Sequence, residues 1–207
     1  VGQQLPELLA FLHGLFPEKH AFSNVHVSPA MPGAPEVWLL GSSGWSASAA
    51  AQLGLPYAAA HFINPVATRA SIEHYQANFC PSGYLSAPQA LIAIGAIVAE
   101  TDAEAQRLYA SQRLRRRLRD LGERGPIPTP EDALARLHDL PDTPSANEGE
   151  EWPRVLVGSI DHVHDQLQDI AGQLNLEELM LITVIHDHAA RKHSYGLLAG
   201  AFHLNAD

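Results

Sequence analysis

Short, continuously apolar runs that alternate with helix-like segments constrain this chain's fold more than any other feature. The longest is Ala-Leu-Ile-Ala-Ile-Gly-Ala-Ile-Val-Ala at 90–99. Further strands are predicted at 37–41, 57–63 and 179–185. Because these runs do not alternate apolar with polar residues, they indicate strands buried on both faces. Such strands separated by helices predict a parallel α/β sheet covered by helices.

Helix-start signals mark the segments between the strands. Thr101 and Glu104 have the spacing of a capping box, and Asn64 stands before Pro65 as an N-cap before a first helical residue. Ser159 and Asp187 are further candidate caps. Helices are therefore predicted at 5–14, 46–54, 65–79, 101–121, 160–174 and 187–202.

Right-handed crossovers would curl four such βα units into half of a barrel or into an open doubly wound sheet. The periodicity by itself does not separate these two folds. We expect one domain over 1–207, within which the Pro-, Gly- and acid-rich stretch 122–152 forms an excursion or mobile loop region.

The amino-acid composition argues against several classes of function. The 207 residues carry a net charge of −10, with 46% apolar and 17% charged residues, which predicts a globular protein with a sizeable core. The negative charge argues against nucleic acid or an anionic membrane surface as a partner. The single cysteine, Cys80, excludes an internal disulfide and fits a reducing cytoplasm. No run approaches the about 20 apolar residues of a membrane span, and no signal peptide is visible.

The first residue, Val1, is not a methionine, and an apolar helical pattern follows almost at once. We therefore expect the chain to be the interior of a longer polypeptide, or a protein that lacks an N-terminal part.

A turn of small residues, Gly41-Ser42-Ser43-Gly44-Trp45-Ser46, links the first predicted strand to an alanine-rich helix. Uncapped N–H groups and the helix dipole meet at such a junction, which is a favourable place for a phosphate. The functional interpretation uses the hydroxyls of Ser43 and Ser46 with the backbone N–H groups of 43–46. The alternative is a polar loop whose serines cap the helix, and the absence of lysine excludes a Walker-type site.

Several histidines are candidates for cofactor or substrate contacts or for metal binding. His61 and Phe62 end the second predicted strand, where barrel active sites lie, so His61 is either a flavin- or substrate-orienting group or a buried core histidine. The pairs His162/His164 and His186/His188 do not have the spacing of convergent zinc ligands, and we predict no metal site.

Three other features have ordinary explanations. The basic run 113–119 is predicted as a solvated helix face, since Asp120 and Glu123 stand beside it. Cys80 has no neighbouring base, and Trp38 is a core residue by default, although Trp38 and Trp45 could border an aromatic cofactor.

As a set, four segments resemble the C-terminal half of bacterial luciferase-like flavin monooxygenases. They are Val37-Trp-Leu-Leu-Gly-Ser-Ser43 with 51–57; His61-Phe62 with Pro65; 100–105; and Asp187-His-Ala-Ala-Arg191 with Ser194-Tyr195. The resemblance implies a TIM barrel, of which the four strands would be the fifth to eighth, and an FMN cofactor, or a deazaflavin in some branches. It also places Ser42, Ser43 and Ser46 at the flavin phosphate, and His61 and Phe62 near the flavin and substrate cavity. No catalytic residue is carried over.

The resemblance implies an enzyme that oxygenates a small organic substrate with reduced FMN, supplied by a separate reductase, and O₂. The first half of the barrel is absent here, and we expect further residues of the same protein, a cleavage partner or another copy to supply it. The alternatives are a non-catalytic or degenerate flavin-binding fragment and a metal-dependent hydrolase built on the histidines.

Overall fold

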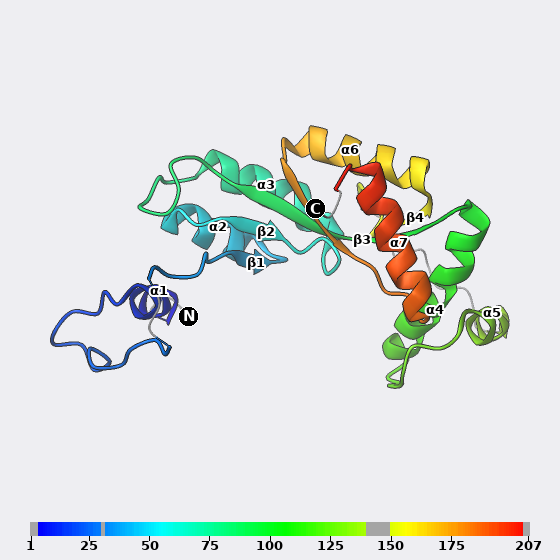
Figure 1. Cartoon of the computed structure of the whole chain (residues 1–207), viewed down its shortest axis with the longest axis horizontal. Coiled ribbons are helices and arrows are strands. Elements are labelled where there is room, and N and C mark those ends of the chain that lie inside the picture. Colours follow the sequence, from blue (N-terminus) through cyan, green and yellow to red (C-terminus); the bar gives the residue numbers. More distant parts are fainter. Residues whose placement is uncertain (1–3, 30–31, 140–149, 205–207) are drawn as a thin grey trace. The chain divides into compact units, whose positions relative to one another are not determined.

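The computed structural model of the chain describes residues 4–29, 32–139 and 150–204 (Figure 1). The chain separates into two compact units, Val1–Val37 and Trp38–Asp207. The prediction of one domain over 1–207 stays a prediction.

The first unit contains the helix α1 (Gln4–His13), as the sequence predicted for 5–14. Its Leu9 is buried. After α1 the chain turns, and the rings of Phe16 and His20 stack with centroids 4.5 Å apart. None of the predicted site residues belongs to this unit.

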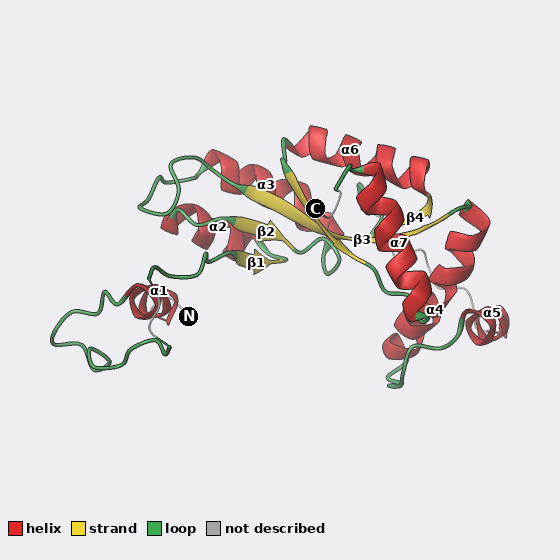
Figure 2. Ribbon diagram, in the orientation of Figure 1, coloured by secondary structure: helices red, strands yellow, loops and turns green. Residues whose placement is uncertain are grey.

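In the second unit, the described residues form five strands of one parallel sheet (Figure 2). The order β1-β2-β3-β4 runs through neighbouring pairs, and β5 also pairs with β3. β4 pairs with Gly95–Ala99 of β3, whereas β5 pairs with Leu91–Gly95. The parallel α/β prediction is confirmed. The strands are β1 (Leu39–Gly41), β2 (Tyr57–Ala59), β3 (Ala90–Ala99), β4 (Val155–Ser159) and β5 (Glu178–Ile182).

The predicted number of four strands is wrong, because 155–159 forms β4 instead of merely leading into a helix. Its apolar part is only three residues long, too short to signal a strand without the partner β3. β1 and β2 are also shorter than predicted. The chain leaves the sheet after Ala59, where the N–H of His61 donates to the Ala59 carbonyl at 2.9 Å.

One face of β3 carries the main core. Ile92, Ile94, Ala96 and Val98 point to this face and belong to one buried cluster with side chains of four helices. These helices are α2 (Gly44–Leu53), α3 (Thr68–Ala77), α6 (Ile160–Leu174) and α7 (His188–Ala201).

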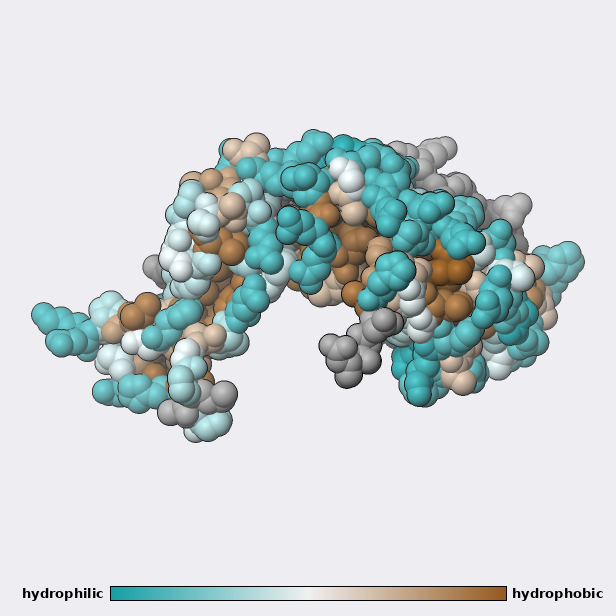
Figure 3. All heavy atoms as spheres, turned by 45° about the horizontal axis from the view of Figure 1, so that its top comes forward, coloured by the Kyte–Doolittle hydropathy of each residue, from teal (hydrophilic) through white to brown (hydrophobic). Residues whose placement is uncertain are grey.

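The opposite face of the sheet is only partly covered. Pairing places Leu40 beside Ala58, and Ala58 beside Leu91, so these side chains share that face. Leu40 is 56% exposed there, and Met180, opposite Ala93, is 47% exposed. In a closed barrel this face is the interior. Figure 3 shows apolar patches in the middle of the second unit, bordered by polar side chains.

A second layer covers the far part of this face. Helix α4 (Asp102–Asp120) packs on Ile97 and Ala99, and helix α5 (Pro130–Asp139) packs on α4. Ala133 of α5 is fully buried against Leu114. The predicted excursion 122–152 therefore contains a docked helix, and residues 140–149 lie outside the described part.

The predicted helix caps divide into two groups. Thr101 Oγ1 accepts from the N–H of Glu104 at 3.2 Å, and Asp187 Oδ1 accepts from Ala190 at 2.7 Å, which confirms both caps. Asn64, before the 3₁₀ turn η1 (Pro65–Ala67), and Ser159 make no side-chain capping bond. No described helix is both long and apolar enough to cross a membrane.

Candidate functional site

The turn after β1 leaves the N-terminus of α2 uncapped. Ser43 has extended backbone angles, φ −138° and ψ 159°, and its side chain makes no capping hydrogen bond. The first N–H groups of an α-helix have no carbonyl partner within the helix, so those of Gly44, Trp45 and Ser46 are available to a ligand. The turn lies at the carboxyl end of β1, the edge at which parallel α/β sheets bind ligands.

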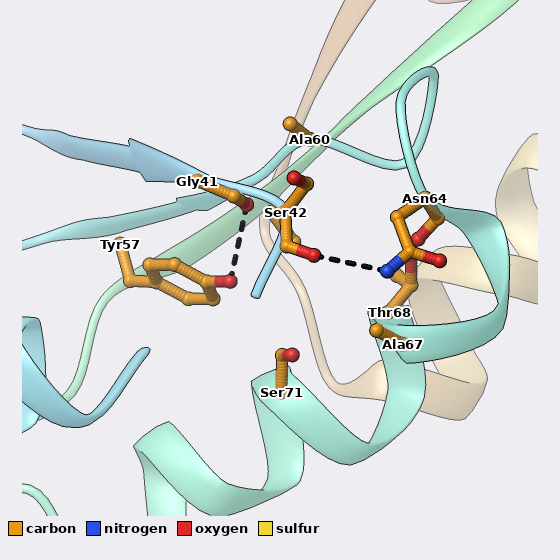
Figure 4. Close-up of a pocket in the computed structure, with 9 residues that line it drawn as sticks. Gly41, Ser42, Tyr57, Ala60, Asn64, Ala67, Thr68 and Ser71 are labelled. Carbon is orange, nitrogen blue, oxygen red and sulfur yellow. Dashed lines mark hydrogen bonds between the residues drawn. The ribbon is translucent and has the colours of Figure 1, made fainter. Parts of the chain in front are cut away.

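The next strand and its loop hold this turn in place (Figure 4). The Gly41 carbonyl accepts from the N–H of Ala60 at 2.8 Å and from the Tyr57 hydroxyl at 3.3 Å. The Ser42 carbonyl accepts from Asn64 Nδ2 at 3.2 Å. The two carbonyls that precede the helix are therefore fixed by β2 and by the segment after it.

The Ser46 side chain packs against the turn. It is buried, and its Oγ donates to the Ser43 carbonyl at 2.8 Å. A Cβ on Gly41 would collide with the Ser46 side chain, so only glycine fits at 41. The Ser46 hydroxyl proton is thus committed to the backbone, while Ser43 is exposed and Ser42 half-buried. Trp45 is 57% exposed beside them.

Tyr57 is a neutral hydrogen-bond donor beneath the turn. Burial raises the pKa of its phenol, and hydroxyl groups of Ser46 and Ser71 partly oppose that shift. Gly41, Ser42 and Tyr57 line a small hollow, and Ser71 projects from α3 toward it (Figure 4).

His61 is fully buried, and both of its ring nitrogens have partners. Nε2 lies 3.1 Å from the Pro153 carbonyl, so it carries the proton and donates. Nδ1 then accepts from the Thr68 hydroxyl at 2.9 Å. Burial is the main cause that lowers the pKa of His61, which keeps the ring neutral. This is the arrangement of a core histidine, one of the two roles that the sequence left open.

Phe62, the next residue, lines a hollow of about 610 Å³. The hollow lies against the partly covered sheet face, since Gly95 of β3 and Ile182 of β5 border it. The structure thus separates the two predicted pocket residues: Phe62 borders the hollow, and His61 turns into the core.

Arginines of α4 border the same hollow, and the sequence did not predict this. Arg115, Arg116 and Arg119 line it together with Arg154. The predicted solvated helix face is therefore wrong for Arg115 and Arg116, which are half-buried, and right for Arg113, which is exposed. The spacing i, i+1, i+4 places three arginines on one side of a helix and was the signal available.

The histidine pairs lie apart from this region of the chain. His162 Nδ1 lies 3.9 Å from Asp102, and the His164 ring packs on Phe202 at 4.9 Å. Within the described ranges, no three His, Cys, Asp or Glu side chains gather as metal ligands would. Cys80 is exposed, and Trp38 is half-buried.

Together, a parallel sheet packed against helices, an uncapped helix N-terminus at a strand's carboxyl end and a hollow on the partly covered sheet face define a barrel-type α/β protein. Residues 2–174 match the family of luciferase-like monooxygenases. The chain belongs to this family.

Individual relatives agree with the family match. The chain is 34% identical over 201 residues to the uncharacterized protein YceB of Bacillus subtilis, and this match covers 97% of the chain and 60% of YceB. The crystal structure of apo-MsnO8 superimposes with a TM-score of 0.88 at 43% identity and covers 99% of this chain and 60% of that one. A type II Baeyer–Villiger monooxygenase, the oxygenating constituent of 3,6-diketocamphane monooxygenase encoded on the CAM plasmid of Pseudomonas putida, shares the fold at 19% identity and a TM-score of 0.55. That protein was crystallised in complex with FMN.

The chain therefore spans about three fifths of the length of these first two relatives, and its fold is a partial luciferase-like barrel.

Proposed function

We propose that this chain holds the flavin phosphate in a flavin-dependent monooxygenase that uses reduced FMN and O₂ on a small organic substrate. The observation that carries the proposal is the uncapped N-terminus of α2, which follows the Gly41–Ser43 turn. The family match supports the reaction class, and the FMN complex of a fold relative supports the cofactor.

The residues present fit a phosphate. The N–H groups of Gly44, Trp45 and Ser46 and the Ser43 hydroxyl are donors at the positive end of a helix dipole, which favours an anion. The hydrogen bonds from Ala60, Tyr57 and Asn64 keep the turn rigid, so little ordering is needed on binding. A deazaflavin cofactor that carries a phosphate would fit the same donors.

In this mechanism the chain binds and orients the cofactor, and the bound reduced flavin supplies the electrons for the reaction with O₂. Ser46 and Gly41 position the turn, and Ser43 contacts the phosphate. Phe62 and Ile182 border the hollow with apolar side chains. A separate reductase supplies the reduced flavin, and further protein, either more residues of the same polypeptide or a second copy, completes the barrel.

The phosphate site is tested by comparing FMN with riboflavin, which lacks the phosphate. We expect FMN to bind at least about tenfold more tightly in a fluorescence-quenching titration, because charge-assisted hydrogen bonds to the phosphate are lost with riboflavin.

Gly44→Pro sharpens this test because it removes one N–H donor at the first helical position, where proline is tolerated. The extended Ser43 is also compatible with a following proline. This variant should weaken FMN binding several-fold and leave riboflavin binding unchanged. Ser48→Ala, one turn further along α2, is the matched control. Equal affinities for FMN and riboflavin would remove the proposal.

Oxygen uptake separates an oxygenase from a flavin-binding protein without catalysis. We expect oxygen consumption that depends on substrate when reduced FMN is added. Stoichiometric zinc in the purified protein without flavin binding would instead support the hydrolase alternative.

A further inference from the structure

The hollow beside Phe62 has a strongly basic wall. Four arginines line it, and no acidic residue stands among its described lining residues. In a protein with a net charge of −10, four positive groups around one hollow of about 610 Å³ are a local inversion of the overall charge.

Among the described residues, two of these four positive groups have no partner. Within the described part of the chain, no hydrogen bond or ion pair joins the guanidinium groups of Arg115 or Arg116 to another residue, and Arg115 Nη1 is buried. Arg119 lies 3.9 Å from Asp120, at the limit of an ion pair. A buried guanidinium nitrogen without a partner is costly unless an anion binds it.

Arg154 differs because it already has a carboxylate partner. Its Nη2 donates to Glu150 Oε1 at 3.0 Å, while its Nε is buried without a partner. The Glu150 side chain is 3% exposed. This pair holds Arg154 just before Val155, the first residue of β4, and leaves Arg115 and Arg116 as the described arginines of the hollow without a partner.

The opposite wall of the hollow is apolar. Phe62 and Ile63 follow β2, and Ile182 and Val184 stand at the end of β5. These are the carboxyl ends of parallel strands, where barrel enzymes bind their substrates.

We propose that this hollow binds an organic anion, whose carboxylate or sulfonate head group pairs with Arg115 and Arg116 while its apolar body lies against Phe62 and Ile182. The anion would be the substrate of the proposed oxygenase, so this assignment of a substrate class rests on the proposed function. Arginine presents a planar fork that matches such head groups, and bidentate pairing fixes the orientation of the ligand.

The test uses binding alone, so that it does not depend on flavin chemistry. The 207-residue chain is titrated with octanoate, octane-1-sulfonate, octan-1-ol and acetate, with chemical shifts of the Phe62 and Ile182 side chains as the readout. The two eight-carbon anions should bind at least about tenfold more tightly than octan-1-ol, which has no charge, and than acetate, which has no apolar body. Added salt should weaken the binding of the two eight-carbon anions and leave the binding of octan-1-ol unchanged.

The variants test which arginines are responsible. The double substitution Arg115→Gln/Arg116→Gln should lower octanoate affinity at least about tenfold. The charge-matched control Arg113→Gln/Arg136→Gln removes two exposed arginines outside the hollow and should leave the affinity unchanged. If the Arg115→Gln/Arg116→Gln variant does not fold, the proposal is tested on the unmodified chain by the salt dependence of octanoate binding and by the comparison of octanoate with octan-1-ol.

Equal binding of octanoate and octan-1-ol, equal loss in both double variants, or no saturable binding would overturn the proposal. Binding of octanoate without any preference for FMN over riboflavin would overturn the proposed phosphate site and leave this hollow intact. The converse result would overturn the anion site alone.

Discussion

The Gly41 backbone lies directly against the Ser46 side chain, so that a Cβ at position 41 has no space. Ser46 in turn donates to the Ser43 carbonyl. The end of β1, the turn and the first turn of α2 are thus one packed unit, and a substitution at 41 affects the proposed phosphate site without touching a ligand.

We expect Gly41→Ala to destabilise the protein by about 1–3 kcal/mol, the usual cost of forcing an added group into a packed position. Urea unfolding measures this change. Gly44→Ala is the control, because a Cβ there meets nothing within 4 Å. It should be neutral or slightly stabilising, since alanine favours a helix. Equal losses in the two variants would contradict the packing described here.

His61 predicts a specific pH dependence of stability. Its pKa in the folded protein is lowered by burial, so the unfolded chain takes up a proton at higher pH than the folded one. Stability that is present above about pH 6.5 is therefore lost as pH falls toward the folded pKa.

His61→Gln removes this titration while its amide can still donate to the Pro153 carbonyl. The loss of urea stability between about pH 7.5 and about pH 5 should be smaller in this variant than in the parent. The exposed His186→Gln controls for the general effect of losing one imidazole. A pH dependence identical to that of the parent would show that burial of His61 does not disfavour its protonation.

The helix caps give a discriminating pair of variants. Thr101→Ala should cost about 1 kcal/mol, because the hydroxyl accepts the N–H of Glu104. Ser159→Ala should cost less, since Ser159 makes no side-chain capping bond and only its backbone N–H contacts Asp102. Chemical denaturation of both variants measures the difference, and the reverse order would contradict the cap assignments.

Docking of α5 on α4 is tested by Leu114→Ala. Leu114 is fully buried in the cluster that includes Ala133, so its truncation should cost about 2–5 kcal/mol. Amide protons of α5 should also exchange faster with solvent. Leu134→Ala, at a side chain 48% exposed on α5, is the control and should change stability by less than about 0.5 kcal/mol. Protection of α5 unchanged in the Leu114 variant would argue against this docking.

Much of the local structure follows from the sequence. The continuous run 90–99 predicts β3 with its observed bounds, because ten apolar residues in a row leave no polar face for an exposed strand. Thr101 and Asp187 cap the helices that their spacing predicts, since a cap depends only on residues a few positions apart. The Gly41–Ser46 turn is likewise visible as a strand-to-helix junction.

The features that the sequence did not indicate depend on contacts between residues far apart in the chain. β4 is a strand because it pairs with Gly95–Ala99 of β3, beyond the Ala90–Ile92 segment that pairs with β2. Ser46 cannot be separated from Ser43 by residue type, yet the first is buried under the turn and the second is exposed.

The arginines show the same division between local and tertiary information. Helical periodicity is enough to place Arg115, Arg116 and Arg119 on one side of α4. Whether that side faces water or a hollow is decided by β2, β5 and the segment after α4, all distant in the chain. The sequence alone thus determined most of the elements and the strand-to-helix turn 41–46, because both rest on short-range geometry. The tertiary structure alone decided which polar groups are buried without partners, because burial depends on what packs against them.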